Sequence, residues 1–124
     1  MQIALTGTPG TGKTTVAALL HYRVLDINSL VRGGMNLGLD PERGCLEADM
    51  DALAGHLAGI DSKETVILEG HFSHHFADWS IVLRLSPAAL RPRLEMRGYS
   101  QAKIRENLEA EALDVILVEA VDMC

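Results

Sequence analysis

Several residue types are scarce in this sequence, and each shortage excludes a class of protein. The 124 residues include two cysteines, Cys45 and Cys124, which are too few for a disulfide framework and fit a reducing compartment. Glycines interrupt the first apolar stretch, so neither a signal peptide nor a membrane-spanning segment is expected. The 11 basic residues are outnumbered by 17 acidic ones, which disfavours a broad nucleic-acid-binding surface. We therefore expect a cytoplasmic protein without membrane association or direct nucleic-acid binding.

The sequence does contain a regular alternation of short apolar segments and helical patterns. Its length suits one domain, residues 1–124, with a buried core. Alternating strands and helices predict an α/β fold, in which helices cover both faces of a parallel sheet. The segments expected to form strands are 3–5, 23–26, 65–69 and 80–85.

Other segments carry loop or helix signals. From residue 33 to residue 44 the chain is rich in glycine and contains Pro41, which predicts a mobile excursion rather than sheet or core. Capping residues and periodicity predict the helices. These helices are expected over 46–57, from 87 to about 97, and from 100 toward 121.

The most informative motif is the segment GTPGTGKT, residues 7–14, which matches the pattern G-x-x-x-x-G-K-[ST] in full. It lies between an expected strand and an expected helix, where a phosphate-binding loop belongs. Its glycines allow backbone N–H groups to turn inward around phosphates. Lys13 adds a positive charge, and the hydroxyl of Thr14 is suited to bind Mg²⁺. The motif predicts binding of a nucleotide with its magnesium ion.

Two acidic residues end expected strands. Glu69 lies where a P-loop enzyme usually directs an acidic group toward Mg²⁺, although a strand-end carboxylate can also simply face water. Asp26 either joins the same site or caps the helix that follows it.

Three histidines lie within five residues of one another. A zinc site formed by His71, His74 and His75 is disfavoured, because no cysteine or nearby acid supplies a clear fourth ligand. His71 follows Glu69 closely and is better placed to contact a phosphate or an attacking water.

Two arginines four residues apart, Arg93 and Arg97, share one face of an expected helix. Such a pair is often just a solvated surface, but beside a P-loop it can hold phosphate charge bidentately. Lys103 and Arg105 lie beyond Gly98, on a segment that could close over ATP.

The motifs GTPGTGKT, NSLVR, ILEGHFSH and RLEMRGYSQAKIRENLEAE, in this order, resemble the nucleoside monophosphate kinase superfamily. More narrowly, the chain resembles the adenylate kinase isoenzyme 6 family in its archaeal form. The resemblance implies a three-layer P-loop NTPase fold, with adenylate kinase and ATPase activity that depend on Mg²⁺. Eukaryotic members of that family also act in maturation of the small ribosomal subunit and bind one of its proteins.

The resemblance also implies roles for individual residues. Arg97 would reach ATP from the boundary of a lid, about residues 97–107, and Arg93 would lie nearer the adenine. Arg32 would hold the acceptor monophosphate, with Asp26 also at the acceptor site, in or beside a region of about residues 28–51. Catalysis would involve Lys13, Arg93, Arg97, Glu69 and His71, and Mg²⁺ would be held by Thr14 and Glu69. The ATP phosphates would be bound by Gly10, Gly12, Lys13, Thr14 and Thr15.

The sequence also departs from the family pattern. The first helix is expected to be about a turn short. The Gly-Phe-Pro-Arg stretch of ordinary adenylate kinases is replaced here by residues 70–73, Gly-His-Phe-Ser. Family members continue into a further strand and helix, so the sheet is expected to have about four strands here.

Three functions are consistent with these features. The first is a kinase that transfers the γ-phosphate of Mg·ATP to a nucleoside monophosphate, with AMP the first candidate. The second is an ATPase that acts as an assembly factor and binds a small-subunit ribosomal protein. The third is a truncated, inactive nucleotide-binding module.

Overall fold

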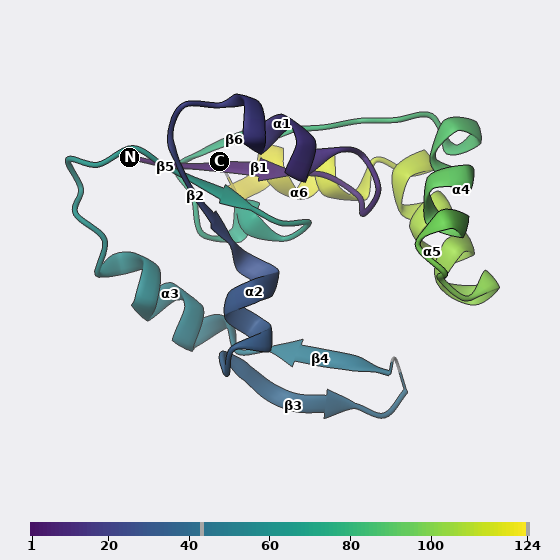
Figure 1. Cartoon of the computed structure of the whole chain (residues 1–124), viewed down its shortest axis with the longest axis horizontal. Coiled ribbons are helices and arrows are strands. Elements are labelled where there is room, and N and C mark those ends of the chain that lie inside the picture. The colour runs from purple at the N-terminus through teal and green to yellow at the C-terminus, as the bar shows by residue number, and fades with distance from the viewer. Residues whose placement is uncertain (43, 124) are drawn as a thin grey trace.

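A computed structural model describes residues 1–42 and 44–123 of the chain (Figure 1). The expected alternation of strands and helices is confirmed, with helices on both faces of a parallel sheet. The strands are β1 (Gln2–Thr6), β2 (Arg23–Asp26), β3 (Asn36–Asp40), β4 (Cys45–Ala48), β5 (Val66–Glu69) and β6 (Trp79–Val82). The helices are α1 (Lys13–Leu19), α2 (Ile27–Arg32), α3 (Met50–Ala58), the 3₁₀ turn η1 (Ser73–His75), α4 (Pro87–Met96), α5 (Gln101–Ala112) and α6 (Val115–Met123).

The main sheet has four parallel strands in the order β2-β5-β1-β6. This number agrees with the expectation of about four strands. Because parallel strands end at one edge of a sheet, the loop after β1 and the acidic ends of β2 and β5 meet there. Leu5 and Asp26, on the two neighbouring strands, are both in register with Glu69.

The two faces of the sheet form separate parts of the core. On one face, Leu5 and Ile67 pack with Ala17 of α1. On the other face, Ala4 and Leu68 pack against buried side chains of α2 and α3. Side chains alternate between faces along each strand, and β1 and β5 are apolar on both faces, as expected of central parallel strands.

The glycine-rich stretch forms a hairpin, so the prediction of a mobile excursion outside any sheet was wrong. Strands β3 and β4 pair antiparallel in a two-stranded sheet of their own, which projects from the end of α2 (Figure 1). Gly38 and Gly44 have φ values of 103° and 66°, which allow an irregular register and a tight turn that other residues rarely permit. Glycine here shapes a strand pair instead of preventing one.

Two predicted helices also have different bounds. The helix expected from residue 46 begins at Met50, because the preceding residues belong to β4 and Asp49 caps the helix by accepting a hydrogen bond from the Ala52 amide. The helix expected from residue 100 toward 121 is broken at Asp114, whose φ is 57°. After this break, α6 turns back and contacts η1 and β6.

Helices α4 and α5 form a pair at one end of the molecule, beside the loop after β1 (Figure 1). Ser86 caps α4 and Ser100 caps α5. Residues 97–107, where a lid is expected, comprise the turn between these helices and the first half of α5. Helices α4 and α5 pack through Leu90, Leu94, Ile104 and Leu108.

Within the described ranges, no helix has both the length and the apolar character needed to cross a membrane.

Candidate nucleotide-binding site

The loop from Gly7 to Gly12 is tightly enclosed by the elements around it. Gly7 has a φ of 146°, and a Cβ atom there would lie 2.6 Å from the carbonyl oxygen of Leu83. Gly10 has a φ of 92°, and its Cβ would lie 2.9 Å from a methyl group of Leu90 on α4. Glycine is thus favoured at both positions by conformation, and at Gly7 a backbone atom also leaves no space for a side chain. The loop is held between the chain after β6 and helix α4.

Lys13, the first residue of α1, is the buried charge of this loop. Its side chain donates hydrogen bonds to the carbonyl oxygens of Gly7 at 2.9 Å and Thr8 at 3.2 Å, and the residue is 8% exposed. Burial lowers its pKa from 10.5 to about 8, an effect that the nearby Glu69 carboxylate partly offsets. A buried ammonium in a loop of this shape suits the recognition of a phosphate anion.

Thr14 and Glu69 lie next to each other across the sheet edge. The Thr14 hydroxyl donates to Glu69 Oε1 at 3.4 Å, which is a long contact. Glu69 is 7% exposed, and its pKa is raised, first by burial and then by the carboxylate of Asp26. Asp26 itself caps α2 by accepting hydrogen bonds from the amides of Asn28 and Ser29. The helix-capping role, one of the two considered for this residue, is therefore observed.

The three neighbouring histidines separate into two groups. Burial and the charge of Lys13 lower the pKa of His71 to about 4, so this imidazole is neutral at pH 7 and belongs to the loop region. His74 and His75 instead face α6, where both approach Glu119. The acid that the local sequence did not supply therefore comes from a helix more than forty residues further along.

The predicted arginines differ in how closely they approach the loop. Arg93 donates from Nη1 to the carbonyl oxygen of Gly10 at 3.2 Å, which brings α4 into contact with the loop. Arg97 ends α4, and its charge lowers the pKa of both Lys13 and Glu69, so it lies in the same electrostatic environment. Arg32 points elsewhere: it donates to the Ser29 hydroxyl at 3.1 Å and is 65% exposed.

The remaining cations of the expected flap lie on α5, and the last predicted phosphate-binding residue lies on α1. Lys103 lies 4.0 Å above the centre of the Tyr99 ring, in the turn and first half of α5. Arg105 lines a surface hollow between α4 and α5. Thr15 is exposed on the first turn of α1, directly after Thr14. Lys103 and Arg105 are thus engaged on the α4–α5 pair, and Thr15 stands at the start of the helix that follows the loop.

The donor set of this site fits a magnesium nucleotide. A hydroxyl and a carboxylate 3.4 Å apart offer the oxygen ligands that Mg²⁺ prefers. Lys13 and Arg93 bring positive charge to the same loop. The buried Thr8 hydroxyl has no hydrogen-bond partner within the described part of the chain, so the loop retains an unsatisfied polar group.

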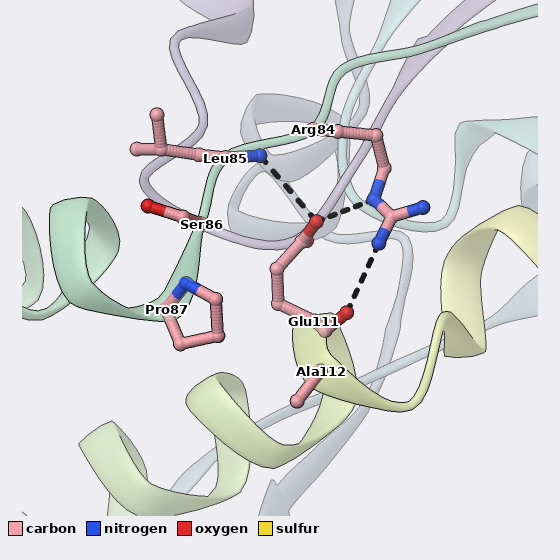
Figure 2. Close-up of a pocket in the computed structure, with 6 residues that line it drawn as sticks. All are labelled: Arg84, Leu85, Ser86, Pro87, Glu111 and Ala112. Atoms are coloured by element: carbon pink, nitrogen blue, oxygen red, sulfur yellow. Dashed lines mark hydrogen bonds and ion pairs between the residues drawn. The ribbon is translucent and has the colours of Figure 1, made fainter.

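A second hollow, of about 350 Å³, lies where the chain leaves β6 and meets α5 (Figure 2). Its wall contains Glu111, a carboxylate that is 3% exposed and accepts from Arg84 Nε at 2.5 Å and from the Leu85 amide at 3.4 Å. Arg84 also pairs with Asp114. Sequence reasoning missed this ion-pair network, because its partners lie far apart along the chain and follow no motif. None of the loop residues 7–14 lines this hollow.

The order of strand, glycine-rich loop, lysine and threonine, with an acid on the adjacent strand, defines a P-loop nucleotide-binding protein. Solved structures share this fold. TT1252 from Thermus thermophilus is 21% identical, with a TM-score of 0.53 over 90% of this chain and 80% of that one. A "putative fructose transport system kinase" from Silicibacter sp. TM1040 is 20% identical, with a TM-score of 0.55 over 91% and 84% of the two chains.

The family is shown by closer relatives. Residues 3–114 match the family model described as an AAA domain. Archaeal proteins named "Putative adenylate kinase" are 46% identical in Methanosarcina barkeri and 51% identical in Methanothermobacter thermautotrophicus. These matches cover 100% and 98% of this chain, and 72% and 73% of the relatives. The chain therefore belongs to the family of these archaeal proteins, which confirms the resemblance predicted from its motifs.

Proposed function

We propose that this protein is a phosphotransferase that moves the γ-phosphate of Mg·ATP to a nucleoside monophosphate, with AMP as the first candidate. The observation that carries the proposal is the meeting of Lys13, Thr14 and Glu69 at the end of β1 and β5. Family membership supports it, because the relatives are named for this reaction. The combination suits phosphoryl transfer, which depends mainly on positioning and charge stabilisation.

Each residue near the loop has a proposed task. Lys13, Arg93 and Arg97 bind the negative charge of the phosphates, and Thr14 and Glu69 hold Mg²⁺. The metal, when bound, neutralises charge on the phosphate oxygens. Lys13 would exchange its two carbonyl acceptors for phosphate oxygens, which are stronger, charged partners. The loop backbone at Gly10 and Gly12, followed by Thr15, surrounds the same phosphates.

The acceptor is proposed to bind on the side of α2 and the β3–β4 hairpin, within residues 28–51. Arg32 is exposed there, and among the described residues its partners are Ser29 and Asp26, whose carboxylate is 3.9 Å away. Exposed pairs of this kind are weak, so the guanidinium is able to turn toward a phosphate monoester. Asp26 is also proposed to line the acceptor side, because it ends the strand next to Glu69.

A second function is favoured by His71. An imidazole with a pKa of about 4 is neutral at pH 7 and can accept a hydrogen bond from water near the phosphates. This would support ATP hydrolysis in the cytoplasm by an assembly factor for the small ribosomal subunit, with a ribosomal protein as its partner. The sequence resemblance supports this alternative.

The product profile tests these proposals. Purified protein is given Mg·ATP alone or with AMP, CMP or UMP, and nucleoside diphosphate is separated from free phosphate. Diphosphate made from one monophosphate supports the kinase and identifies its acceptor. Free phosphate that a small-subunit protein increases supports the ATPase, and ATP binding without any product indicates an inactive module.

Variants add a sharper test of the acceptor side. Arg32→Met should raise the KM for the monophosphate while leaving ATP binding intact, because only the acceptor loses a charged partner. Arg23→Met is the matched control, since Arg23 is also an exposed arginine in an ion pair, with Glu64 at 3.3 Å. Equal effects of the two substitutions would contradict the proposed acceptor position.

A further inference from the structure

Three side chains of types that can bind a metal cluster on the face of the sheet opposite α1, outside the proposed nucleotide site. One donor atom each from His74, His75 and Glu119 lies within 4.8 Å of the others. Glu119 Oε2 is 2.8 Å from His74 Nε2 and 3.6 Å from His75 Nε2. In a tetrahedral zinc site with bonds of about 2.0 Å, ligand atoms are separated by roughly 3.3 Å. The two separations from Glu119 lie within about 0.5 Å of this value, and the histidine donor atoms lie within 4.8 Å of each other.

The surroundings of His74 have the character of a built metal site. Its side chain is fully buried, and its Nδ1 lies 2.9 Å from the hydroxyl of Thr6. Metal-binding histidines usually use their second ring nitrogen in this way, which fixes the ring and leaves the other nitrogen directed at the metal. Here the other nitrogen, Nε2, is the one directed at Glu119.

The other two donors leave a way in for an ion. The side chain of His75 is 27% exposed and that of Glu119 is 40% exposed, so the cluster opens to solvent on one side. A water molecule could therefore complete the coordination. Imidazole nitrogen is a borderline donor, whereas Mg²⁺ and Ca²⁺ take oxygen ligands. Two imidazoles with one carboxylate therefore suit Zn²⁺ and similar transition metals better.

We propose that His74, His75 and Glu119 form a site for one transition-metal ion of the Zn²⁺ class. The ion would join η1 to α6, two elements that are already in contact. The ion would also be connected to the loop, because its ligand His74 contacts Thr6, the last residue of β1 before Gly7. The site is independent of the proposed phosphotransferase reaction.

The test is metal binding in the absence of nucleotide. The chain is prepared with Cys45→Ser and Cys124→Ser to remove thiol ligands, treated with a chelator, and titrated with Zn²⁺ by calorimetry. Co²⁺ is then added as a spectroscopic probe, because its visible absorption reports a low coordination number with nitrogen and oxygen ligands. We expect one equivalent of Zn²⁺ to bind and to raise the melting temperature, whereas Mg²⁺ should not compete.

Variants at the exposed donors separate ligation from folding. His75→Ala and Glu119→Gln should each weaken Zn²⁺ by about tenfold or more, while the metal-free proteins keep the wild-type melting temperature within a few degrees. His56→Ala is the matched control, since it removes a histidine from α3, outside the cluster. Thr6→Val, which replaces the hydroxyl by a methyl group, should also weaken Zn²⁺ binding, by roughly tenfold.

Either of two results would overturn the proposal. One is the absence of stoichiometric Zn²⁺ binding, which would show that the three side chains interact by hydrogen bonds without a metal. The other is binding of equal strength in wild type, His75→Ala and Glu119→Gln, which would place the ion elsewhere. Because no nucleotide is present, neither result bears on the phosphotransferase proposal.

Discussion

Replacing Lys13 by methionine should stabilise the nucleotide-free protein while abolishing ATP binding. Lys13 is 8% exposed, and burial lowers its pKa from 10.5 to about 8. A lowered lysine pKa means that the folded state disfavours the charged form relative to the unfolded chain. Methionine has a similar length and carries no charge, so it removes this cost. It also removes the cation proposed to bind phosphate.

The magnitude follows from two opposing contributions. The fall of the pKa from 10.5 to about 8 corresponds to a folded-state cost on the order of 3 kcal/mol, at about 1.4 kcal/mol per pKa unit. Against this, two hydrogen bonds are lost. The Thr8 carbonyl also accepts from Thr11, so mainly the Gly7 carbonyl loses a partner, at about 1 kcal/mol. The net stabilisation is about 2 kcal/mol at pH 7, or roughly 8 °C in Tm.

The pH dependence has a definite sign. Below about pH 8, Lys13 is protonated in both folded and unfolded chains, and the full cost is present. As the pH rises from about 8 toward 10.5, the folded protein loses this proton before the unfolded chain does, so the wild type gains stability. The advantage of Lys13→Met should therefore shrink over this range.

The assay is denaturant unfolding in the presence of a chelator and without nucleotide, at pH 7 and again above pH 9. Lys63→Met is the matched control, because Lys63 is an exposed lysine and should show little change. Calorimetric titration with Mg·ATP then checks the loss of binding. A variant less stable than wild type at pH 7, or an advantage that does not change with pH, would refute the reasoning.

Three further predictions concern the loop, the ion pair of Arg84 with Glu111, and helix α4. Gly7→Ala should destabilise the protein by more than Gly34→Ala in thermal unfolding, because both glycines have positive φ values but only at Gly7 would the added Cβ meet a backbone oxygen, at 2.6 Å. Arg84→Met should cost about 2–4 kcal/mol in denaturant unfolding by leaving the buried carboxylate of Glu111 unpaired, and adding Glu111→Leu should recover much of that loss; an additive double variant would argue against coupling. Leu94→Ala, at a fully buried position beside the loop, should cost about 3 kcal/mol and weaken ATP binding, and unchanged affinity would show that α4 does not support the loop.

Local patterns in the sequence determined the framework of the molecule. The motif at residues 7–14 required a strand before it and a helix after it, and β1 and α1 lie there. Apolar runs identified the four parallel strands, because strands buried on both faces need side chains that are apolar throughout. Pro87 marked the start of α4 and Ser100 that of α5 for similarly local reasons. The fixed φ of proline suits the first turn of a helix, and a serine hydroxyl can satisfy a free amide there.

The hairpin of β3 and β4 shows where local reasoning failed. A high glycine content usually indicates a loop. In this hairpin, however, the turn and the irregular register need positive φ values, and glycine supplies them. The same composition is thus compatible with both outcomes. The pairing partner, which no local pattern specifies, decided between them.

Only the tertiary structure decided which distant charges meet. The sequence identified Lys13, Thr14 and Glu69 separately, and the order of the strands brought them to one edge. The sequence near His74 indicated no acidic partner for it. Glu119 contacts His74 because the chain turns at Asp114 and brings α6 against η1. Hydrophobic periodicity and caps act over a few residues, whereas contacts between charges depend on how whole elements pack. For that reason the fold and the phosphate-binding loop could be predicted, and the cluster of His74, His75 and Glu119 could not.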